Sequence, residues 1–584
     1  MSSRVLLPAC LSAGLLVVSF FPLNWGVFGW IALVPWLMLV PAVSPRRRSW
    51  NIYLAGWLGS LLFLVPALQW LRVAHPMMHF TWAGLSLYCS LYFVLSLWLM
   101  RRFVARGVPL PVVVPIVWLA TEFLRGSIGG GFAWYTLGQT QHDFLPIIQI
   151  ADVVGMWGVS GLVAAVNGLI AAWLLQSDRV RRWLRIPETP RTPTPFTAPA
   201  TLRRATIAIV GCWLATFGYG LMQLNHPEFP MGPRVALIQG NLEQGVRIAR
   251  NANDPDAARN AIREMSNHHV ELANQAASAP NPPDVIIWPE TSYPLPWVRL
   301  PRERPADVAE DLWDDLSYTR NYVRERFIEM GKGWGTHALI GLNGKTLSPT
   351  DPKKTLRYNT ALLINPEGEP TAYYHKMHRV PFGEYIPFKD SLPFLKWFSP
   401  YDYDYGIEAG TEWTQFELPS KGQIYRFGVV ICYEDSDPTL ARQYNSRVPV
   451  DFLVNISNDG WFKGSEEHEQ HLAVARFRAV ETRRALVRAV NMGVSAVIDG
   501  DGRIVALPGD SWATSKAIPA ALVADVPIDD RVSFYGQFGD WLPLLCLTAV
   551  LAALLLVRDQ PQWPGENRPT AATPPSAAKS GVTG

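Results

Sequence analysis

Long apolar segments constrain this 584-residue chain more than any other feature of its sequence. A bilayer core of about 30 Å is crossed by about 20 mostly apolar residues in a helix, because backbone polar groups cannot stay unsatisfied in hydrocarbon. Segments of this kind cover residues 5–21, 25–43, 52–73, 80–100, 110–124, 153–175, 205–222 and 538–557. We therefore predict a polytopic α-helical membrane protein with about eight transmembrane helices.

The same pattern divides the chain into four regions. We predict a membrane domain with seven transmembrane helices over 1–223, a soluble α/β domain inserted at 224–537, and an eighth transmembrane helix at 538–558. A tail at 559–584, rich in Pro, Ala, Ser and Thr, is predicted to be disordered. The formal net charge of +3 indicates no polyanionic partner, so we expect no nucleic-acid binding.

The arginines in the short loops predict the orientation. Arginine and lysine collect on the cytoplasmic side of short membrane loops. Thirteen arginines follow the second, fourth and sixth predicted helices, namely Arg46, Arg47, Arg48, Arg101, Arg102, Arg106, Arg179, Arg181, Arg182, Arg185, Arg191, Arg203 and Arg204, whereas Arg72 and Arg125 lie on the other side. Both termini are then cytoplasmic, and the 224–537 domain is extracytoplasmic.

One outer loop of the membrane domain, residues 126–152, is too long and apolar for a simple turn. It either lies in the membrane interface and shapes a lipid entrance, or is a re-entrant packing segment. Few ionisable residues interrupt the spans, which is unusual for a proton-coupled transporter.

Short apolar runs alternate with amphipathic stretches between 224 and 537, which predicts an α/β domain. A helix is expected to start at Asp254, with Pro255 at its first position and His269 on its buried face. A second helix is expected over 465–487, where we favour structural roles for His468 and His471 over metal binding. The Asp501-Gly502 pair predicts a hairpin. We predict no metal site and no cofactor.

The cysteines single out one candidate nucleophile. Four of the five fall in predicted membrane helices, which leaves Cys432 alone in the outer domain. It ends the apolar run 427–431 and precedes Tyr433, Glu434 and Asp435, so we place it at a sharp strand end, where a nucleophile can be exposed. On position alone, a buried inert thiol is as good an interpretation as a reactive one.

Acyl chemistry by a thiol requires a base, an oxyanion donor and orienting groups. Glu290 closes an apolar run, and this setting is expected to raise its pKa toward that of a general base. Lys376 and Glu384 follow another predicted strand. His375 or His378 could instead form a Cys-His pair with Cys432.

At these positions the sequence resembles the nitrilase superfamily, with Trp288-Pro289-Glu290, Tyr374-His375-Lys376 and Ile431-Cys432-Tyr433-Glu434 as its Glu-Lys-Cys triad. Three further blocks make it similar to the apolipoprotein N-acyltransferase family: residues 375–385, 455–462 and, in the membrane part, 138–141 with 149–160. The resemblance covers nearly the whole chain except its C-terminal tail.

The resemblance implies an αββα nitrilase-like sandwich on eight helices in the bacterial inner membrane, with the catalytic domain facing the periplasm. It implies that a glycerophospholipid, typically phosphatidylethanolamine, donates its sn-1 acyl chain to Cys432 as a thioester. The α-amino group of an S-diacylglyceryl-cysteine apolipoprotein then accepts that chain, which completes lipoprotein maturation. Two substrates anchored in the bilayer suit an enzyme fixed at its surface.

The resemblance also implies roles for individual residues. Glu290 is the base, Lys376 stabilises the oxyanion with the backbone N–H of Tyr433, and Cys432 is the nucleophile. Glu384 and Glu434 orient the triad. Trp461, His378 and Tyr385 are expected to border the acyl or headgroup channel.

Two departures and two rival functions remain open. Residues 244–248 lack a Trp that relatives often carry, and residues 296–321 form either a mobile lid or a surface insertion, of which we favour the second. The closest rival is a membrane-anchored nitrilase-type amidase, in which water resolves the thioester. A transporter or receptor is the other rival, but it leaves Glu290, Lys376 and Cys432 unexplained.

Overall fold

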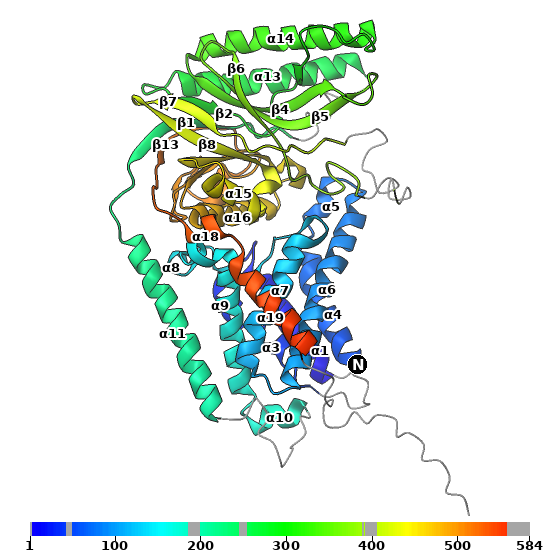
Figure 1. Cartoon of the computed structure of the whole chain (residues 1–584), viewed down its shortest axis with the longest axis vertical. Coiled ribbons are helices and arrows are strands. Elements are labelled where there is room, and N and C mark those ends of the chain that lie inside the picture. Colours follow the sequence, from blue (N-terminus) through cyan, green and yellow to red (C-terminus); the bar gives the residue numbers. More distant parts are fainter. Residues whose placement is uncertain are drawn as a thin grey trace, which may run out of the picture.

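A helical bundle forms one end of the molecule and two stacked β-sheets form the other (Figure 1). The computed structural model describes residues 3–42, 50–184, 199–243, 254–387, 391 and 406–556. Several sequence features lie outside these ranges: Arg46, Arg47, Arg48, Arg185, Arg191, residues 244–248 and the 559–584 tail.

The bundle is built from apolar helices. Within the described ranges, five helical segments are long and apolar enough to cross a membrane: Trp50–Ala74, Met78–Val104, Leu110–Gly130, Ala151–Leu174 and Pro199–Leu224. Their main helices are α4 (Trp50–Ala67), α5 (Leu71–Ala74), α6 (Met78–Val104), α7 (Leu110–Ser127), α9 (Ala151–Leu174) and α11 (Pro199–Leu224), with α10 (Asp178–Leu184) between the last two. Shorter apolar helices also belong to the bundle, among them α1 (Ser3–Ser19) and α19 (Trp541–Leu556).

The second predicted span is not one helix, so the count of eight is not confirmed. Residues 25–43 instead contain three short turns, η1 (Gly26–Phe28), α2 (Gly29–Ala32) and α3 (Val34–Leu37). Asn167 of α9 binds the broken backbone, because its side chain accepts a hydrogen bond from Leu33 N at 2.8 Å and donates one to Gly29 O at 2.9 Å. An irregular backbone is tolerated at membrane depth where protein groups satisfy it in this way. That partner is more than 130 positions away in the sequence, which local hydropathy does not reveal.

The outer domain contains two β-sheets. The first has the order β13-β1-β2-β4-β5-β6, with β3 also paired to β4, and the second has the order β12-β11-β10-β9-β8-β7. The strands of the first sheet are β1 (Met231–Gln239), β2 (Val285–Ile287), β3 (Trp297–Arg299), β4 (His337–Leu347), β5 (Thr355–Ile364), β6 (Pro370–His375) and β13 (Ala520–Pro527). Those of the second are β7 (Phe416–Ser420), β8 (Gln423–Ile431), β9 (Phe452–Asn458), β10 (Ala485–Asn491), β11 (Ala496–Ile498) and β12 (Ile504–Ala506). Strands β8, β9 and β10 run parallel, as do β1, β2 and β4.

Helices cover the outer face of each sheet, which confirms the predicted αββα sandwich. Apolar side chains of both sheets, among them Leu237, Val429 and Val454, form the core between them. Helices α13 (Pro255–Ala277) and α14 (Glu310–Trp334) cover the first sheet, and α15 (Pro438–Ser446) and α16 (Glu467–Thr482) lie on the second, nearer the bundle (Figure 1).

Several predicted details of this domain are confirmed. Asp254 caps α13 by accepting a hydrogen bond from Asp256 N, and His269 is fully buried. β11 and β12 pair as the hairpin expected around Asp501-Gly502. Residues 296–321 contribute β3 and the start of α14, so they are built into the sheet and its cover.

The helix expected over 465–487 ends earlier than predicted. Arg483 follows Thr482 with a φ of +50°, and the chain then enters β10 at Ala485. The left-handed residue ends the helix and points the chain into the sheet. Apolar residues continue through both elements, so composition alone does not mark the boundary.

The outer domain is fastened to the bundle through α16 and the 126–152 loop. Phe477 and Val480 of α16 pack with Ile147 and Trp157 of the bundle. The loop contains η2 (Ile128–Gly130), η3 (Leu137–Gln141) and α8 (Leu145–Ile148), and most of its central residues are buried. Of the two roles considered for this loop, packing is the one its burial supports, and Gly130 in addition lines the pocket described below.

Candidate active site

Cys432 lies at a sharp turn directly after a buried strand. β8 ends at Ile431, and η5 (Cys432–Ser436) begins at the cysteine itself, which has a φ of +54°. This conformation is uncommon for a residue with a side chain, and such strain gathers at functional sites. The side chain of Asn455 on β9 donates a hydrogen bond to Cys432 O at 3.2 Å, which helps to fix the turn. The sequence-based placement of Cys432 at a strand end is correct.

Lys376 lies between two carboxylates from different segments. Its Nζ is 3.3 Å from Glu290 Oε1 and 2.8 Å from Glu384 Oε1, and its side chain is 1% exposed. Asn359 of β5 joins the same group, because its amide donates to Glu290 at 2.6 Å and to Glu384 at 3.4 Å. Burial works to lower the pKa of Lys376, but Glu384 and Glu290 outweigh it and hold that pKa well above its ordinary value. Lys376 is therefore a fixed cation.

The thiol of Cys432 interacts with the same group. Burial, and next to it the negative charge of Glu290, raise the pKa of Cys432 to about 12, while Lys376 acts in the opposite direction. A thiol with this pKa stays protonated near neutral pH and needs a base to become a nucleophile. The structure thus brings together Glu290, Lys376 and Cys432, which lie far apart in the sequence.

Glu434 connects the cysteine turn to the lysine segment. Its Oε1 accepts the backbone N–H groups of Met377 and His378 at 2.6 and 2.9 Å, and its Oε2 accepts that of Ile431 at 2.7 Å. The Tyr374 hydroxyl donates to the same carboxylate at 3.0 Å. Glu434 is fully buried, and burial raises its pKa to about 7. It holds residues on both sides of the candidate site in one arrangement.

Tyr433 extends from the turn toward the membrane domain. Its ring lies parallel to that of Trp134, with centroids 6.1 Å apart, and is stacked with Phe132 at 6.5 Å. Its hydroxyl donates to Gly131 O at 3.3 Å. The residue after Cys432 therefore rests on the 126–152 loop.

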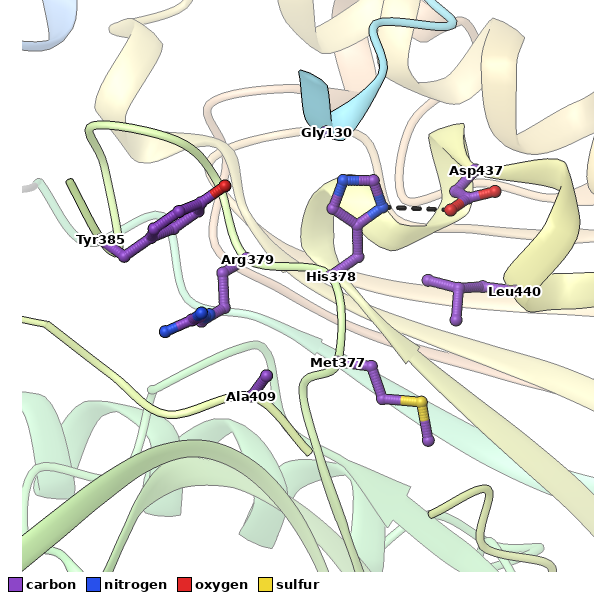
Figure 2. A pocket seen from close by; sticks show the side chains of 8 residues that line it. All are labelled: Gly130, Met377, His378, Arg379, Tyr385, Ala409, Asp437 and Leu440. Atoms are coloured by element: carbon purple, nitrogen blue, oxygen red, sulfur yellow. Dashed lines mark hydrogen bonds and ion pairs between the residues drawn. The ribbon is translucent and has the colours of Figure 1, made fainter. Parts of the chain in front are cut away.

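A pocket of about 260 Å³ lies between Gly130 of that loop and the segment of the outer domain that directly follows Lys376 (Figure 2). It is lined by Gly130, Met377, His378, Arg379, Tyr385, Ala409, Asp437 and Leu440. His378 and Tyr385, both expected to contact substrate, are among them. Trp461, expected there as well, lies in η6 (Asp459–Phe462) and is not part of this lining.

Neither histidine considered as a partner for the thiol is placed as its base. His375 bonds to Thr360 at 2.9 Å and stacks on Tyr358 at 4.3 Å, and burial lowers its pKa to about 4. His378 Nδ1 lies 3.1 Å from Asp437 Oδ2. Burial lowers the pKa of His378, but Asp437 more than offsets this and raises it above its ordinary value. Both rings are engaged by residues other than Cys432.

A buried ionic cluster behind the turn was missed from the sequence. Arg488 binds Asp435 at 2.8 Å, Asp459 at 2.9 Å and the Asn455 side chain at 2.5 Å. His471 bonds to Asp435 at 2.8 Å and Asp459 at 3.1 Å. The available signal was a single arginine inside the apolar strand 485–491, since a buried charge needs partners. Asn359 had no comparable signal.

This cluster also contains the one grouping of metal-type ligands within the described residues, Asp459, Glu467 and His471. The sequence pattern around His471 did not indicate carboxylate ligands, but Asp459 and Glu467 lie beside it in the structure. Burial works to lower the pKa of His471, and Arg488 acts in the same direction, but Asp435 and Asp459 outweigh them and hold it well above its ordinary value. The charges of Arg488 and a protonated His471 offset those of Asp435 and Asp459.

Comparisons with known proteins decide the family. Residues 12–169 match the apolipoprotein N-acyltransferase N-terminal domain, and residues 234–532 match the carbon-nitrogen hydrolase family. An apolipoprotein N-acyltransferase of Geobacter metallireducens is 30% identical over 95% of this chain and 96% of its own length. The chain belongs to the apolipoprotein N-acyltransferase family.

Other members of the apolipoprotein N-acyltransferase family match over similar lengths. Those of Rhodopirellula baltica and Chlorobaculum tepidum are each 28% identical, over 91% and 94% of this chain and 93% and 96% of their own. Among solved structures, an amidase from Nesterenkonia is 17% identical, with a TM-score of 0.33 over 52% of this chain and 94% of its own. A carbon-nitrogen hydrolase from Helicobacter pylori is 14% identical, with a TM-score of 0.34 over 50% of this chain and 89% of its own. The resemblance seen in the sequence is confirmed, and the acyltransferase is favoured over the amidase alternative.

Proposed function

We propose that this protein transfers an acyl chain from a glycerophospholipid to the α-amino group of an S-diacylglyceryl-cysteine apolipoprotein, through a thioester on Cys432. The observation that carries the proposal is the arrangement of Lys376 between Glu290 and Glu384, in electrostatic contact with Cys432. Family membership supports the lipoprotein acceptor, since relatives along the whole chain are named for it.

In the first half-reaction, Glu290 accepts the thiol proton and Cys432 Sγ attacks the sn-1 ester carbonyl. Lys376 and the backbone N–H of Tyr433 stabilise the oxyanion. As the intermediate collapses, the ester C–O bond breaks, Glu290 returns the proton to the departing oxygen, and a lysophospholipid leaves.

In the second half-reaction, the acceptor amine attacks the thioester carbonyl and loses a proton to Glu290. The C–S bond breaks, and the thiolate of Cys432 takes that proton back. An amide forms and the enzyme returns to its starting state. Glu384 and Glu434 position Lys376 and the cysteine turn, while His378, Tyr385 and Trp461 border the substrate path.

We assign this chemistry to the periplasmic face of the bacterial inner membrane, with both termini cytoplasmic. The domain bounds follow the sequence proposal: 1–223 and 538–558 in the membrane, 224–537 outside it, and 559–584 as a cytoplasmic tail. The arginine bias of the loops supports this orientation. Labelling of single cysteines introduced at Ser2 and at Tyr318 by a membrane-impermeant maleimide tests it. Only the second site is expected to react in spheroplasts.

The activity test uses phosphatidylethanolamine in mixed micelles and a synthetic S-diacylglyceryl-cysteinyl peptide. N-acylation of the peptide is expected with the wild type, and none with Cys432→Ala. Cys212→Ala is the matched control, because Cys212 is an exposed cysteine on α11 and should leave the rate unchanged. Release of free fatty acid with no peptide acylation would instead support the amidase-like rival.

A further inference from the structure

The pocket beside the triad joins two parts of the chain that are distant in sequence. Gly130 belongs to the loop of the membrane bundle, whereas Met377, His378 and Arg379 follow β6 of the outer domain. Leu440 comes from the first turn of α15. A ligand in this pocket therefore touches the bundle and the catalytic domain at once (Figure 2).

Among the residues that the structure describes, the charges in the pocket leave one cation, Arg379, without an anionic partner. His378 and Asp437 form an ion pair at 3.1 Å, so their charges offset each other. Arg379 donates to Ile407 O at 2.6 Å and lies over the Tyr385 ring at 4.5 Å. No carboxylate in the described part of the chain forms an ion pair with Arg379. The lining thus carries a net charge of about +1, held in place by a carbonyl and an aromatic face.

This arrangement suits a phosphate ester. A guanidinium is planar, is always charged and presents N–H groups in a fork that matches phosphate oxygens. The Tyr385 hydroxyl faces the same space, since it lies 3.9 Å from where a Cβ on Gly130 would be. One net positive charge matches the single negative charge of a phosphodiester better than the nearly double charge of a phosphomonoester.

The pocket lining also contacts the turn that carries the nucleophile. The ring of His378 is 5.5 Å from that of Tyr433, the residue after Cys432. Glu434 binds the backbone of Met377 and His378 on one side and that of Ile431 on the other. In a glycerophospholipid, the phosphodiester and the sn-1 ester are carried by the same glycerol. A lipid with its ester at Cys432 can therefore place its phosphate in this pocket.

We propose that Arg379, assisted by Tyr385 and the His378–Asp437 pair, binds the phosphodiester of the acyl-donor lipid and so selects donors by that group. This inference rests on the proposed function, because it concerns the donor of the same reaction. It assigns the pocket to the lipid headgroup and not to free phosphate.

The test compares two acyl donors in the formation of the Cys432 thioester. One is phosphatidylethanolamine, and the other is p-nitrophenyl palmitate, which carries an acyl ester and no phosphate. Loss of a charged hydrogen bond should raise the half-saturating concentration of phosphatidylethanolamine about tenfold in Arg379→Gln. The value for p-nitrophenyl palmitate should stay unchanged. Equal effects on both donors, or none on either, would contradict the inference.

Arg447→Gln is the matched control. Arg447 is exposed at the far end of α15 and lies over the Trp413 ring at 5.6 Å, so it loses the same charge and a similar stacking contact outside the pocket. Both donors should behave as in the wild type. If Arg447→Gln weakened phosphatidylethanolamine binding as much as Arg379→Gln does, the effect would come from the overall loss of positive charge. The assignment of the pocket would then be overturned.

A competition experiment on the wild-type protein does not depend on a variant that folds. Glycerophosphoethanolamine should raise the half-saturating concentration of phosphatidylethanolamine, and inorganic phosphate at the same concentration should do so much less. A stronger effect of inorganic phosphate would assign the pocket to free phosphate. If the wild type formed no thioester with either donor, the proposed function would fail, whereas equal use of both donors by Arg379→Gln and wild type would remove only the phosphate site.

Discussion

The indole of Trp134 lies parallel to the phenol ring of Tyr433, with the ring planes 5° apart. Trp134 belongs to a loop of the membrane bundle, and Tyr433 directly follows the candidate nucleophile. The indole N–H of Trp134 also donates a hydrogen bond to the Gln470 side chain of α16 at 3.1 Å. The membrane domain thus contacts the turn that carries Cys432, so this contact helps to fix the position of the candidate nucleophile relative to the bundle.

Removing that contact should slow acylation of Cys432. Trp134→Ala is expected to reduce the rate about tenfold, since an aromatic pair contributes about 0.5–1.5 kcal/mol beyond its buried area. Trp134→Phe should retain most of the rate. Trp25→Ala is the control, because Trp25 is exposed and pairs only with Phe28 at 6.0 Å among the described aromatic contacts. A full rate in Trp134→Ala, measured by thioester formation, would remove this role.

Glu290→Gln should make the Cys432 thiol more acidic and yet slow acyl transfer. Because the charge of Glu290 raises the pKa of Cys432, its removal should lower that pKa and speed alkylation by iodoacetamide about tenfold at pH 8. Acyl transfer from phospholipid should fall by about 10²-fold or more, because the base is lost. Glu290 would not be the base if the variant kept its transfer rate.

Glu434→Gln should destabilise the fold around the turn. In the wild type, the carboxylate accepts hydrogen bonds from three backbone N–H groups and the Tyr374 hydroxyl. The amide of the variant has only one oxygen to accept them. Buried donors left without acceptors cost about 1–3 kcal/mol each. Glu417→Gln, at an exposed pair with Arg426, should change the free energy of unfolding by less than about 1 kcal/mol. Thermal unfolding in detergent compares the two, and equal shifts would contradict the role of Glu434.

The His378–Asp437 pair should make stability depend on pH. The folded-state pKa of His378 is raised, so the pair's contribution of about 1 kcal/mol is complete below the ordinary histidine pKa of about 6.5 and is lost as pH rises through the raised value. Asp437→Asn can still cap α15 but should abolish this dependence. The difference in unfolding temperature between wild type and variant should therefore shrink from pH 6 to pH 9. If the difference in unfolding temperature instead grew from pH 6 to pH 9, the predicted role of the pair would be contradicted.

Arg483 should be essential for joining the two domains. It is fully buried and binds Asp152 of α9 at 2.8 Å and Asp501 at 3.1 Å. Arg483→Ala removes the positive partner of these carboxylates. Breaking a buried ion pair lowers the free energy of unfolding by about 3–5 kcal/mol. Arg503→Ala removes a more exposed partner of Asp501 and should cost about 1 kcal/mol or less. Unfolding in detergent monitors both variants, and a similar loss in each would show that burial of Arg483 is unimportant.

The fold class and the strand-end position of the candidate nucleophile could be predicted from the sequence because their signals are local. Apolar runs marked the membrane segments, and the sandwich followed from the resemblance. Cys432 was identifiable as the outer-domain cysteine that closes an apolar strand. The cap at Asp254 and the hairpin at Asp501-Gly502 are likewise set by adjacent residues.

What the sequence did not reveal depends on contacts between distant segments. Asn359 sits in the middle of a strand and becomes important only because Glu290 and Glu384 converge on it. Asn167 forms the hydrogen bonds that the broken backbone of the second predicted span lacks. Arg483, in a left-handed conformation, ends α16 and binds Asp152. No local pattern of hydropathy or propensity encodes these partners.

The most direct test of the central claim is mass spectrometry of a single turnover. The protein is loaded with phosphatidylethanolamine, freed from excess lipid, and then given a diacylglyceryl-cysteinyl peptide. The account predicts a fatty-acyl mass on the Cys432 peptide that disappears as the acceptor amine gains the same mass. An acceptor acylated with no adduct on Cys432 at any time, or an adduct lost to water while the acceptor stays unmodified, would contradict it.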